Sequence, residues 1–278
     1  MDRPLVSFLL PSRSGVGVAR TSEALFQSLR SIVTTSSDSN VYEVLIRFDD
    51  DDEDSIKLTS KIHELFASTI AVVKIIIGPR YGYIGLHHYY NELAAISTGE
   101  LLFLWNDDLE FLPVRSGWKR RNGPHEVEEW DMILKGEFER LEPHIFILYP
   151  TEVYWDLPIE WDESAIHDND YRRARHISSL AFPILTRNAY EAMGHFSSSP
   201  LNDSYLTNVG VMCLDGKNIR KRSRIILHHY PDTDEIGQGW RADTPEYEEA
   251  YRIHCADEIR EAEEKDQEAL KALYEGGD

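Results

Sequence analysis

Two aspartates and an asparagine, Asn106, Asp107 and Asp108, follow directly after an apolar run at residues 101–105. The run predicts a buried strand that delivers their oxygen atoms to its carboxyl end, where open α/β sheets bind ligands. Carboxylate and amide oxygens suit Mg²⁺ or Mn²⁺, and either ion can hold a diphosphate. The alternative is that Asn and Asp merely begin a turn after the strand.

A run of six consecutive carboxylates, residues 49–54, follows a second expected strand at residues 42–48. If the two strands are parallel, this run lies at the same edge of the sheet as Asn106 to Asp108. Six neighbouring carboxylates cannot all be ligands, and most are expected in a solvated acidic turn. The first of them, Asp49 and Asp50, are placed to accept hydrogen bonds from a nucleobase or a ribose.

Alternating β-rich and helically spaced segments would position these residues. Through roughly the first hundred residues the pattern predicts βαβ units, with parallel strands covered by helices. The strands expected there span residues 5–10, 42–48, 72–77 and 101–105. Three helices are expected between them: one that begins after Thr21, one at residues 56–68 and one at residues 86–97. Further along, we expect helices at 126–141, 187–193, 201–212 and from Pro245 to the end, and strands at 145–149 and 177–185. Residues 151–175 lack a clear period and are interpreted as a lid or substrate-facing excursion.

The composition indicates a folded and strongly acidic protein. Hydrophobic residues make up 42% of the 278 residues, which is enough for a sizeable core, and the formal charge is −20. Such a charge would repel nucleic acid and anionic membranes if it were evenly spread. Many basic residues are instead clustered. If the clusters converge in the fold, they would favour binding of a diphosphate or of an anionic acceptor, such as a phosphorylated glycan or nucleic acid. The alternative is that the clusters are three solvated loops. The clusters are Arg115, Lys119, Arg120 and Arg121; Arg172, Arg173 and Arg175; and Lys217, Arg220, Lys221, Arg222 and Arg224.

Several features favour a cytoplasmic location. No apolar run approaches the roughly 20 residues of a membrane-spanning helix. The amino terminus lacks the basic start and the cleavage site of a signal peptide. Only two cysteines occur, Cys213 and Cys255, and they are expected to be buried or inert thiols in a reducing compartment.

The order of motifs along the chain resembles the nucleotide-sugar half of family 2 glycosyltransferases, which have the GT-A fold. The matching motifs are the opening strand and Pro-Ser turn at residues 6–13, the acidic pair after Phe48, the segment from Gly82 through Asn91 to Gly99-Glu100, and Asn106-Asp107-Asp108 at the Asp-X-Asp position. The match covers roughly residues 4–110, with weaker echoes to about residue 230. The resemblance implies a single-domain α/β, Rossmann-like fold with a mixed, mostly parallel sheet flanked by helices. Within it, residues 1–112 would bind the nucleotide sugar, residues 113–243 would hold the acceptor and the catalytic base, and residues 244–278 would form a C-terminal helix.

The resemblance also implies roles for individual residues near the donor. Asn106 replaces the first Asp of the Asp-X-Asp motif, so Asp108 is the implied metal ligand and Asp107 the contact to a ribose or a water. The implied nucleotide contacts are Pro11, Ser12 and Arg13 in the pocket wall, Asp49 or Asp50 at the base, and Arg80 at the pyrophosphate or the base; a surface arginine is the alternative for Arg80.

In the second half, residues 190–196 look like the helix-Gly-Phe segment that precedes the catalytic carboxylate in that family. Asp203 stands near the expected position, as the base that takes the proton from an acceptor hydroxyl. Alternatively, Asp203 caps the helix that follows. His228 and His229 end the apolar run 225–227, and because a late histidine completes the metal site in similar enzymes, either is a candidate third ligand.

Three hypotheses follow for the function. The first is a metal-dependent, inverting glycosyltransferase that uses a nucleoside-diphosphate sugar, a UDP-sugar in particular, with Mn²⁺ or Mg²⁺. The second is a sugar-phosphate nucleotidyltransferase, which normally carries a Gly-rich basic loop that residues 12–17 match poorly. The third is a non-catalytic GT-A-like protein that binds a nucleotide sugar or glycan. Asn106 favours the third hypothesis, whereas Asp108, Asp203 and the histidine pair argue against it.

Overall fold

An eight-stranded mixed sheet forms the centre of the protein. The computed structural model describes residues 3–13, 22–69, 71–111, 129–141, 144–153, 181–211, 213–214, 217–229 and 245–276. The strand order is β3-β2-β1-β4-β7-β6-β10-β5. The strands are β1 (Val6–Pro11), β2 (Tyr42–Asp49), β3 (Val72–Gly78), β4 (Leu101–Leu104), β5 (Leu109–Phe111), β6 (Ile147–Val153), β7 (Ile184–Thr186) and β10 (Arg220–His229), and β8 (Cys213–Leu214) pairs with β9 (Lys217–Asn218) separately.

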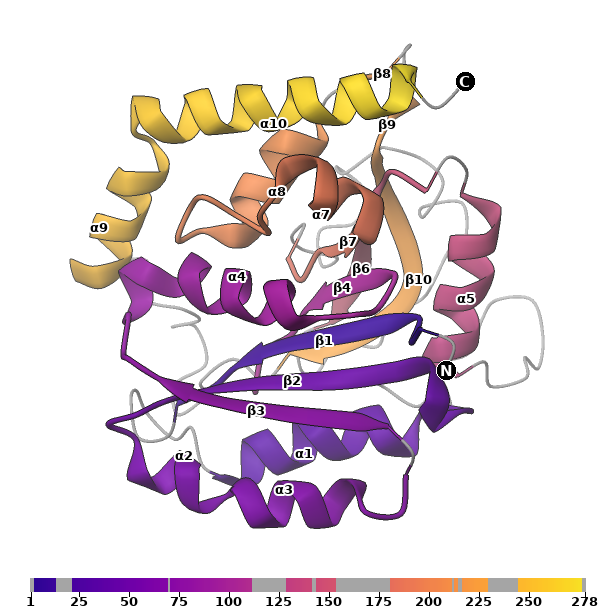
Figure 1. Ribbon diagram of the computed structural model, residues 1–278, viewed down its shortest axis with the longest axis vertical. Helices are drawn as coiled ribbons and strands as arrows, with labels where there is room; N and C mark the ends of the chain where they lie inside the picture. Colours follow the sequence, from indigo (N-terminus) through magenta and orange to yellow (C-terminus); the bar gives the residue numbers. More distant parts are fainter. Residues whose placement is uncertain are drawn as a thin grey trace.

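Strands β3, β2, β1 and β4 are parallel, as are β6 and β10, whereas β7 and β5 pair antiparallel with their neighbours. Helices cover both faces: α1 and α3 lie below the sheet in Figure 1, and α4, α7, α8 and α10 lie above it. The helices are α1 (Ser22–Thr34), α2 (Glu53–Lys57), α3 (Thr59–Phe66), α4 (Leu86–Ile96), α5 (Trp130–Arg140), α7 (Arg187–Met193), α8 (Asn202–Gly210), α9 (Pro245–His254) and α10 (Asp257–Glu275), with 3₁₀ turns η1 (Ser39–Val41) and η2 (Tyr83–Gly85). No helix in the described part of the chain is both long and apolar enough to cross a membrane.

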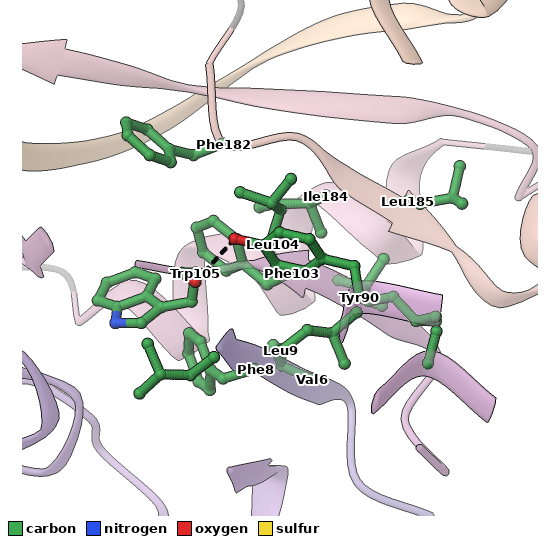
Figure 2. Close-up of a cluster of buried hydrophobic side chains, with 14 of the residues drawn as sticks. Val6, Phe8, Leu9, Tyr90, Phe103, Leu104, Trp105, Phe182, Ile184 and Leu185 are labelled. Carbon is green, nitrogen blue, oxygen red and sulfur yellow. Dashed lines mark hydrogen bonds between the residues drawn. The ribbon is translucent and has the colours of Figure 1, made fainter. Parts of the chain in front are cut away.

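An aromatic cluster packs between β1, β4 and β5 and fixes the end of β4. Phe8 lies 5.4 Å from Phe103 and 5.2 Å from Trp105, measured between ring centroids, and Figure 2 shows these rings together. The buried indole N–H of Trp105 donates to Ser28 Oγ at 2.8 Å, so burial leaves this donor satisfied. Because Trp105 is held on both its ring and its polar edge, the next residues leave the sheet in a defined direction.

The structure differs from the sequence-based expectations at several element boundaries. The helix expected at 56–68 is two helices, α2 and α3, and α2 begins within the acidic run, where Asp52 caps it by accepting a 3.2 Å hydrogen bond from the Ser55 N–H. The expected C-terminal helix is also two, α9 and α10. Strand β5 was not expected. Cys255, expected to be a buried or inert thiol, is exposed. The loop interpreted as a lid, residues 151–175, is described only through residue 153.

Replacing Gly99 or Gly136 with alanine should change the free energy of unfolding in opposite directions. A Cβ at Gly99 would lie 2.8 Å from the backbone nitrogen of Ser7 and 2.9 Å from the carbonyl carbon of Val6. One at Gly136, inside α5, would meet no described residue within 4 Å. We expect Gly99→Ala to lower the free energy of unfolding by roughly 1–3 kcal/mol. Gly136→Ala should raise it by about 0.5–1 kcal/mol, because alanine costs less backbone entropy in a helix. Urea denaturation of both variants checks this, and a Gly99→Ala protein as stable as wild type would contradict the close packing.

Candidate functional site

The carboxyl ends of β1, β2 and β4 bring the two acidic motifs to one edge of the sheet. Ser12, just after β1, donates a 2.7 Å hydrogen bond from Oγ to Asp107 Oδ2. Asp107 is only 4% exposed. Pro11, the last residue of β1, pairs in register with Arg47 of β2. The expected pocket residues of β1 therefore lie beside the acidic turn after β4.

Asp49, at the end of β2, is buried and engaged through both carboxylate oxygens. Arg13 Nη1 lies 2.8 Å from its Oδ2, and the Tyr89 hydroxyl donates to its Oδ1 at 2.7 Å. Arg13 also contacts Asp51, whose carboxylate raises the pKa of Arg13, and Arg13 in turn lowers the pKa of Asp51. The loop after β1 is thus joined to the acidic run by ion pairs.

The remaining residues expected at the base or the pyrophosphate are exposed at this edge. Asp50 is exposed, and its N–H donates to the Gly78 carbonyl at 2.7 Å. Arg80 Nη1 lies 3.9 Å from Asp51 Oδ2, with both side chains about half exposed. Asp49 and Asp50 therefore differ: the first belongs to a buried network, and the second is open to solvent.

Sequence reasoning missed the role of Arg47, whose side chain is fully buried beneath this edge. Its guanidinium lies 2.8 Å from Glu92 and donates to the carbonyl oxygens of Gly78 at 3.1 Å and Pro79 at 2.8 Å. A Cβ at Gly78 would lie 2.8 Å from Nη2, so a side chain there would displace the guanidinium. The sequence signal was an arginine placed between the apolar residues Ile46 and Phe48 of β2.

Tyr89 links Asp49 to the loop after β3. Its hydroxyl donates to Asp49 and accepts hydrogen bonds from the backbone N–H groups of Tyr81 at 2.7 Å and Gly82 at 3.1 Å. Burial first, and the Asp49 carboxylate second, raise the pKa of Tyr89, so the phenol keeps its proton as a donor. Through Tyr89, the loop that carries Arg80 is therefore joined to Asp49 in the candidate site.

The three residues at the Asp-X-Asp position have different surroundings. The Asn106 Oδ1 atom accepts a 2.8 Å hydrogen bond from Tyr90, whose hydroxyl also lies 3.3 Å from the Trp105 carbonyl; Figure 2 draws Tyr90 reaching from α4 toward Trp105. Asp107 is bound by Ser12. Asp108 is partly exposed at the turn into β5. Asn106 and Asp107 thus also serve the fold, and Asp108 is the last residue before β5.

Strand β5 brings the backbone of the histidine pair next to Asp108. In the antiparallel pairing with β10, His229 lies opposite Leu109 and His228 opposite Glu110. Among the side chains that the structure describes, no three from His, Cys, Asp and Glu gather closely enough to bind a metal ion; the imidazoles of His228 and His229 are not among them. Carboxylate oxygen and imidazole nitrogen are donors that accept Mn²⁺, so the residue types fit a divalent metal.

Asp203 is the second residue of α8 and does not cap it. The N-cap is Leu201, and Asp203 Oδ1 accepts a 2.8 Å hydrogen bond from the N–H of Ser204. The alternative in which Asp203 is the helix cap is therefore wrong. The preceding helix α7 ends at Gly194 with φ of 77°, as its sequence predicts.

Asn91 of α4 ties the segment before α8 to the donor-side half. Its Oδ1 accepts hydrogen bonds from the N–H groups of Phe196 at 2.8 Å and Ser197 at 3.1 Å, and its Nδ2 donates to the Ser197 carbonyl at 2.7 Å. Neighbouring residues of one helix thus reach both motifs, since Tyr90 binds Asn106 and Asn91 binds the segment leading to Asp203. Of the basic clusters, the first two lie outside the described residues, and the third runs along β9 and β10.

No protein-family model and no curated protein matches the sequence. Among solved structures, the chain is similar to a mannosyltransferase, PcManGT from Pyrobaculum calidifontis in complex with GDP-Man and Mn²⁺, with a TM-score of 0.55 and 15% sequence identity over 98% of this chain and 70% of that one. It is also similar to residues 1–349 of S. aureus TarS in complex with UDP, with a TM-score of 0.51 and 13% identity over 98% of this chain and 72% of that one. At these identities the likeness establishes the fold, and the expected GT-A-type α/β fold with a mixed, mostly parallel sheet is confirmed.

Proposed function

We propose that this chain is a glycosyltransferase that moves a sugar from a nucleoside-diphosphate sugar, a UDP-sugar in particular, to an acceptor hydroxyl. The observation that carries the proposal is the convergence of Ser12, Arg13, Asp49 and Asn106 to Asp108 at one sheet edge, in a fold similar to a mannosyltransferase solved with GDP-Man and Mn²⁺. The likeness to TarS in complex with UDP supports the same class of ligand.

The charged residues at this sheet edge suit both the phosphates and the nucleoside of a nucleotide. Arg13 and Arg80 supply guanidinium groups, which bind phosphate oxygens through paired hydrogen bonds. Asp49 or Asp50 would accept hydrogen bonds from the base, and Asp107 from a ribose hydroxyl. Because Arg13 is paired with Asp49 and Asp51, a bound diphosphate would compete with these carboxylates for it.

Asp108 and one of His228 and His229 would hold Mn²⁺ or Mg²⁺ together with the donor phosphates. When bound there, the ion would offset the negative charge that develops on the departing nucleoside diphosphate. The register of β5 and β10 supports this choice, because it places the backbone of both histidines beside the residues that follow Asp108.

Asp203 is the proposed base. Its carboxylate would take the proton of the acceptor hydroxyl while that oxygen forms a bond to the anomeric carbon of the donor. The bond from the anomeric carbon to the diphosphate oxygen breaks, and the nucleoside diphosphate leaves with both electrons of that bond. Attack from the face opposite the leaving group inverts the anomeric centre. An anionic acceptor is proposed from the basic clusters, the third of which runs along β9 and β10.

Tyr89→Phe should weaken nucleoside-diphosphate binding without abolishing turnover. The change removes the hydroxyl that holds Asp49 and leaves two backbone N–H groups without their acceptor. We expect the Kd for the nucleoside diphosphate to rise about tenfold, or about 1.4 kcal/mol, because Asp49 would no longer be held in its binding position. Calorimetric titration measures this Kd, with Tyr274→Phe on α10 as a control for loss of a tyrosine hydroxyl elsewhere. Unchanged affinity in Tyr89→Phe would remove Asp49 from the binding site.

The proposed function is tested by incubating the protein with a panel of nucleoside-diphosphate sugars and Mn²⁺ and measuring the free nucleoside diphosphate released. Turnover of one donor, lost on metal chelation, is the expected result. Pyrophosphate release from a nucleoside triphosphate and a sugar phosphate would replace the proposal with nucleotidyl transfer. Donor binding without release of nucleoside diphosphate, with or without added acceptors, would instead identify a non-catalytic binding protein.

A further inference from the structure

A buried carboxylate in the C-terminal helix contacts the segment that carries Asp203. Asp266 lies midway along α10 and is 2% exposed, on the helix face that also buries Ile259 and Leu270. Many other acidic residues of α10 are exposed to solvent. A carboxylate on an apolar helix face costs free energy unless it is paired, so its partners indicate why it is there.

The partners of Asp266 come from either side of the start of α8. The Tyr205 hydroxyl donates to Asp266 Oδ2, and His195 Nε2 lies 3.0 Å from the same oxygen. Burial first, and Asp266 second, raise the pKa of Tyr205, so the phenol remains a donor to the carboxylate. Asp266 therefore contacts His195, which precedes α8 in the chain, and Tyr205, which lies in the first turn of α8.

This cluster is not a nucleophilic triad, although it contains Ser, His and Asp. Ser198 Oγ lies 3.0 Å from His195 Nε2, the same ring nitrogen that faces Asp266. A triad requires the serine and the carboxylate on opposite nitrogens, so that the ring can take the serine proton while the carboxylate orients it. The arrangement instead fixes the His195 ring between the loop and α10.

A second contact joins the same loop to α9. Ser199 Oγ lies 2.9 Å from His254 Nδ1, at the end of α9. At the other end of that helix, the Tyr247 ring stacks on Tyr83 of η2, with 6.5 Å between ring centroids. Figure 1 shows α9 beside the start of α4 and α10 along α7 and α8. The two C-terminal helices thus connect the loop before α8 with the donor-side half.

We propose that Asp266 is a positioning residue that fixes the first turn of α8, and through it the carboxylate of Asp203, so that the C-terminal helices belong to the catalytic unit. The inference rests on the proposed function, because it gives Asp203 the role of base. Asn91 holds the loop before α8 from the side of α4, and Asp266 holds His195 at the start of that loop and Tyr205 in the first turn of α8 from the side of α10. A shift of this turn would displace the base relative to the acceptor without changing the residues expected to bind the donor.

The test compares Asp266→Asn with wild type in steady-state kinetics and in calorimetric donor binding. We expect kcat to fall about tenfold while the donor Kd stays unchanged. In Asp203→Asn, adding Asp266→Asn should lower kcat no further, because the group being positioned is already gone. Tyr205→Phe, which removes a single hydroxyl and keeps the ring, should give a smaller fall in kcat and serves if Asp266→Asn does not fold.

Two controls separate positioning from loss of stability. Asp131→Asn changes an equally buried aspartate, which is 2% exposed. It accepts hydrogen bonds from Ser37 and Asp38, which precede β2 and so lie at the amino ends of the parallel strands, away from the candidate site. Glu263→Gln changes an exposed contact between α8 and α10, to Asn208. Asp131→Asn should lower the melting temperature but not kcat, and Glu263→Gln should change neither.

The outcomes are distinguishable. If wild type turns over a donor but Asp266→Asn and Tyr205→Phe retain full kcat, the positioning role is wrong and the proposed function stands. If the effects of Asp266→Asn and Asp203→Asn on kcat multiply independently, or if donor Kd changes as much as kcat, the role is also wrong. If wild type turns over no donor, the proposed function fails and this inference falls with it.

Discussion

Asp108→Asn is expected to lower kcat for donor turnover about a thousandfold, the size of effect seen when a group that stabilises transition-state charge is removed. Asparagine keeps the shape of the turn into β5 but removes the negative charge that would attract the metal ion. Asp108 is partly exposed and lies outside the aromatic core, so the variant should fold. Release of nucleoside diphosphate with Mn²⁺ present measures the effect.

Asp54→Asn is the matched control for Asp108→Asn. Asp54 is an exposed carboxylate in the first turn of α2, after the carboxyl end of β2, and it contacts Lys57. Removing it changes the net charge by the same amount without touching the proposed metal ligands. Its kcat should equal that of wild type. If both variants lost activity equally, the effect would come from the overall acidity of the edge rather than from a specific ligand.

Asp203→Asn is expected to lower kcat about 10²–10⁴-fold, the usual contribution of a general base, with the donor Kd unchanged. The carboxylate is not the cap of α8, and an amide oxygen can still accept from Ser204, so the helix should remain intact. Transfer kinetics and calorimetry on the same preparation provide the two quantities. Glu191→Gln, an exposed carboxylate on α7, controls for charge near the segment.

The result that contradicts this role is a loss of donor affinity that accounts for the whole loss of rate. Asp203 would then belong to the donor pocket. Full activity in Asp203→Asn would be equally decisive, because the base would have to be another group.

The parallel core of the fold could be predicted from sequence because buried strands are continuous apolar runs. Residues 5–10, 42–48, 72–77 and 101–105 predict β1 to β4 to within a residue or so at either end. Three-residue β5 is too short to show a period, so the strand that joins Asp108 to the histidine pair was missed. The breaks at Leu58 and at Cys255-Ala256 leave no clear signal in helices with many polar residues.

Part of the candidate site also follows from sequence, because parallel strands deliver their carboxyl ends to one edge. That rule predicted that the acidic run at residues 49–54 and Asn106 to Asp108 share an edge. The resemblance added Ser12 and Arg13, which in the structure contact Asp107 and Asp49. The contacts that orient these groups could not be predicted in the same way. Tyr89 and Tyr90 sit in a helix where aromatic residues usually indicate packing. Their hydroxyl groups bind Asp49 at the end of β2 and Asn106 in the turn after β4, which are 40 and 16 residues away.

The contacts of Asp266 could not be predicted from the sequence. It is one acid among many in α10, and the sequence does not single it out from its exposed neighbours. Its partners Tyr205 and His195 are about 60 and 70 residues away and meet it only after α10 docks on α8. Long-range pairings of this kind require the tertiary structure.

We propose that the edge formed by β1, β2 and β4 binds a nucleoside diphosphate through a divalent ion held by Asp108. Calorimetric titration of wild type and Asp108→Asn with UDP and GDP, with and without Mn²⁺, tests it most directly. We predict that one diphosphate binds wild type in the presence of Mn²⁺ and that the affinity falls at least tenfold without the ion or without the Asp108 carboxylate. Absence of binding to either nucleotide, or equal binding by Asp108→Asn, would contradict the claim.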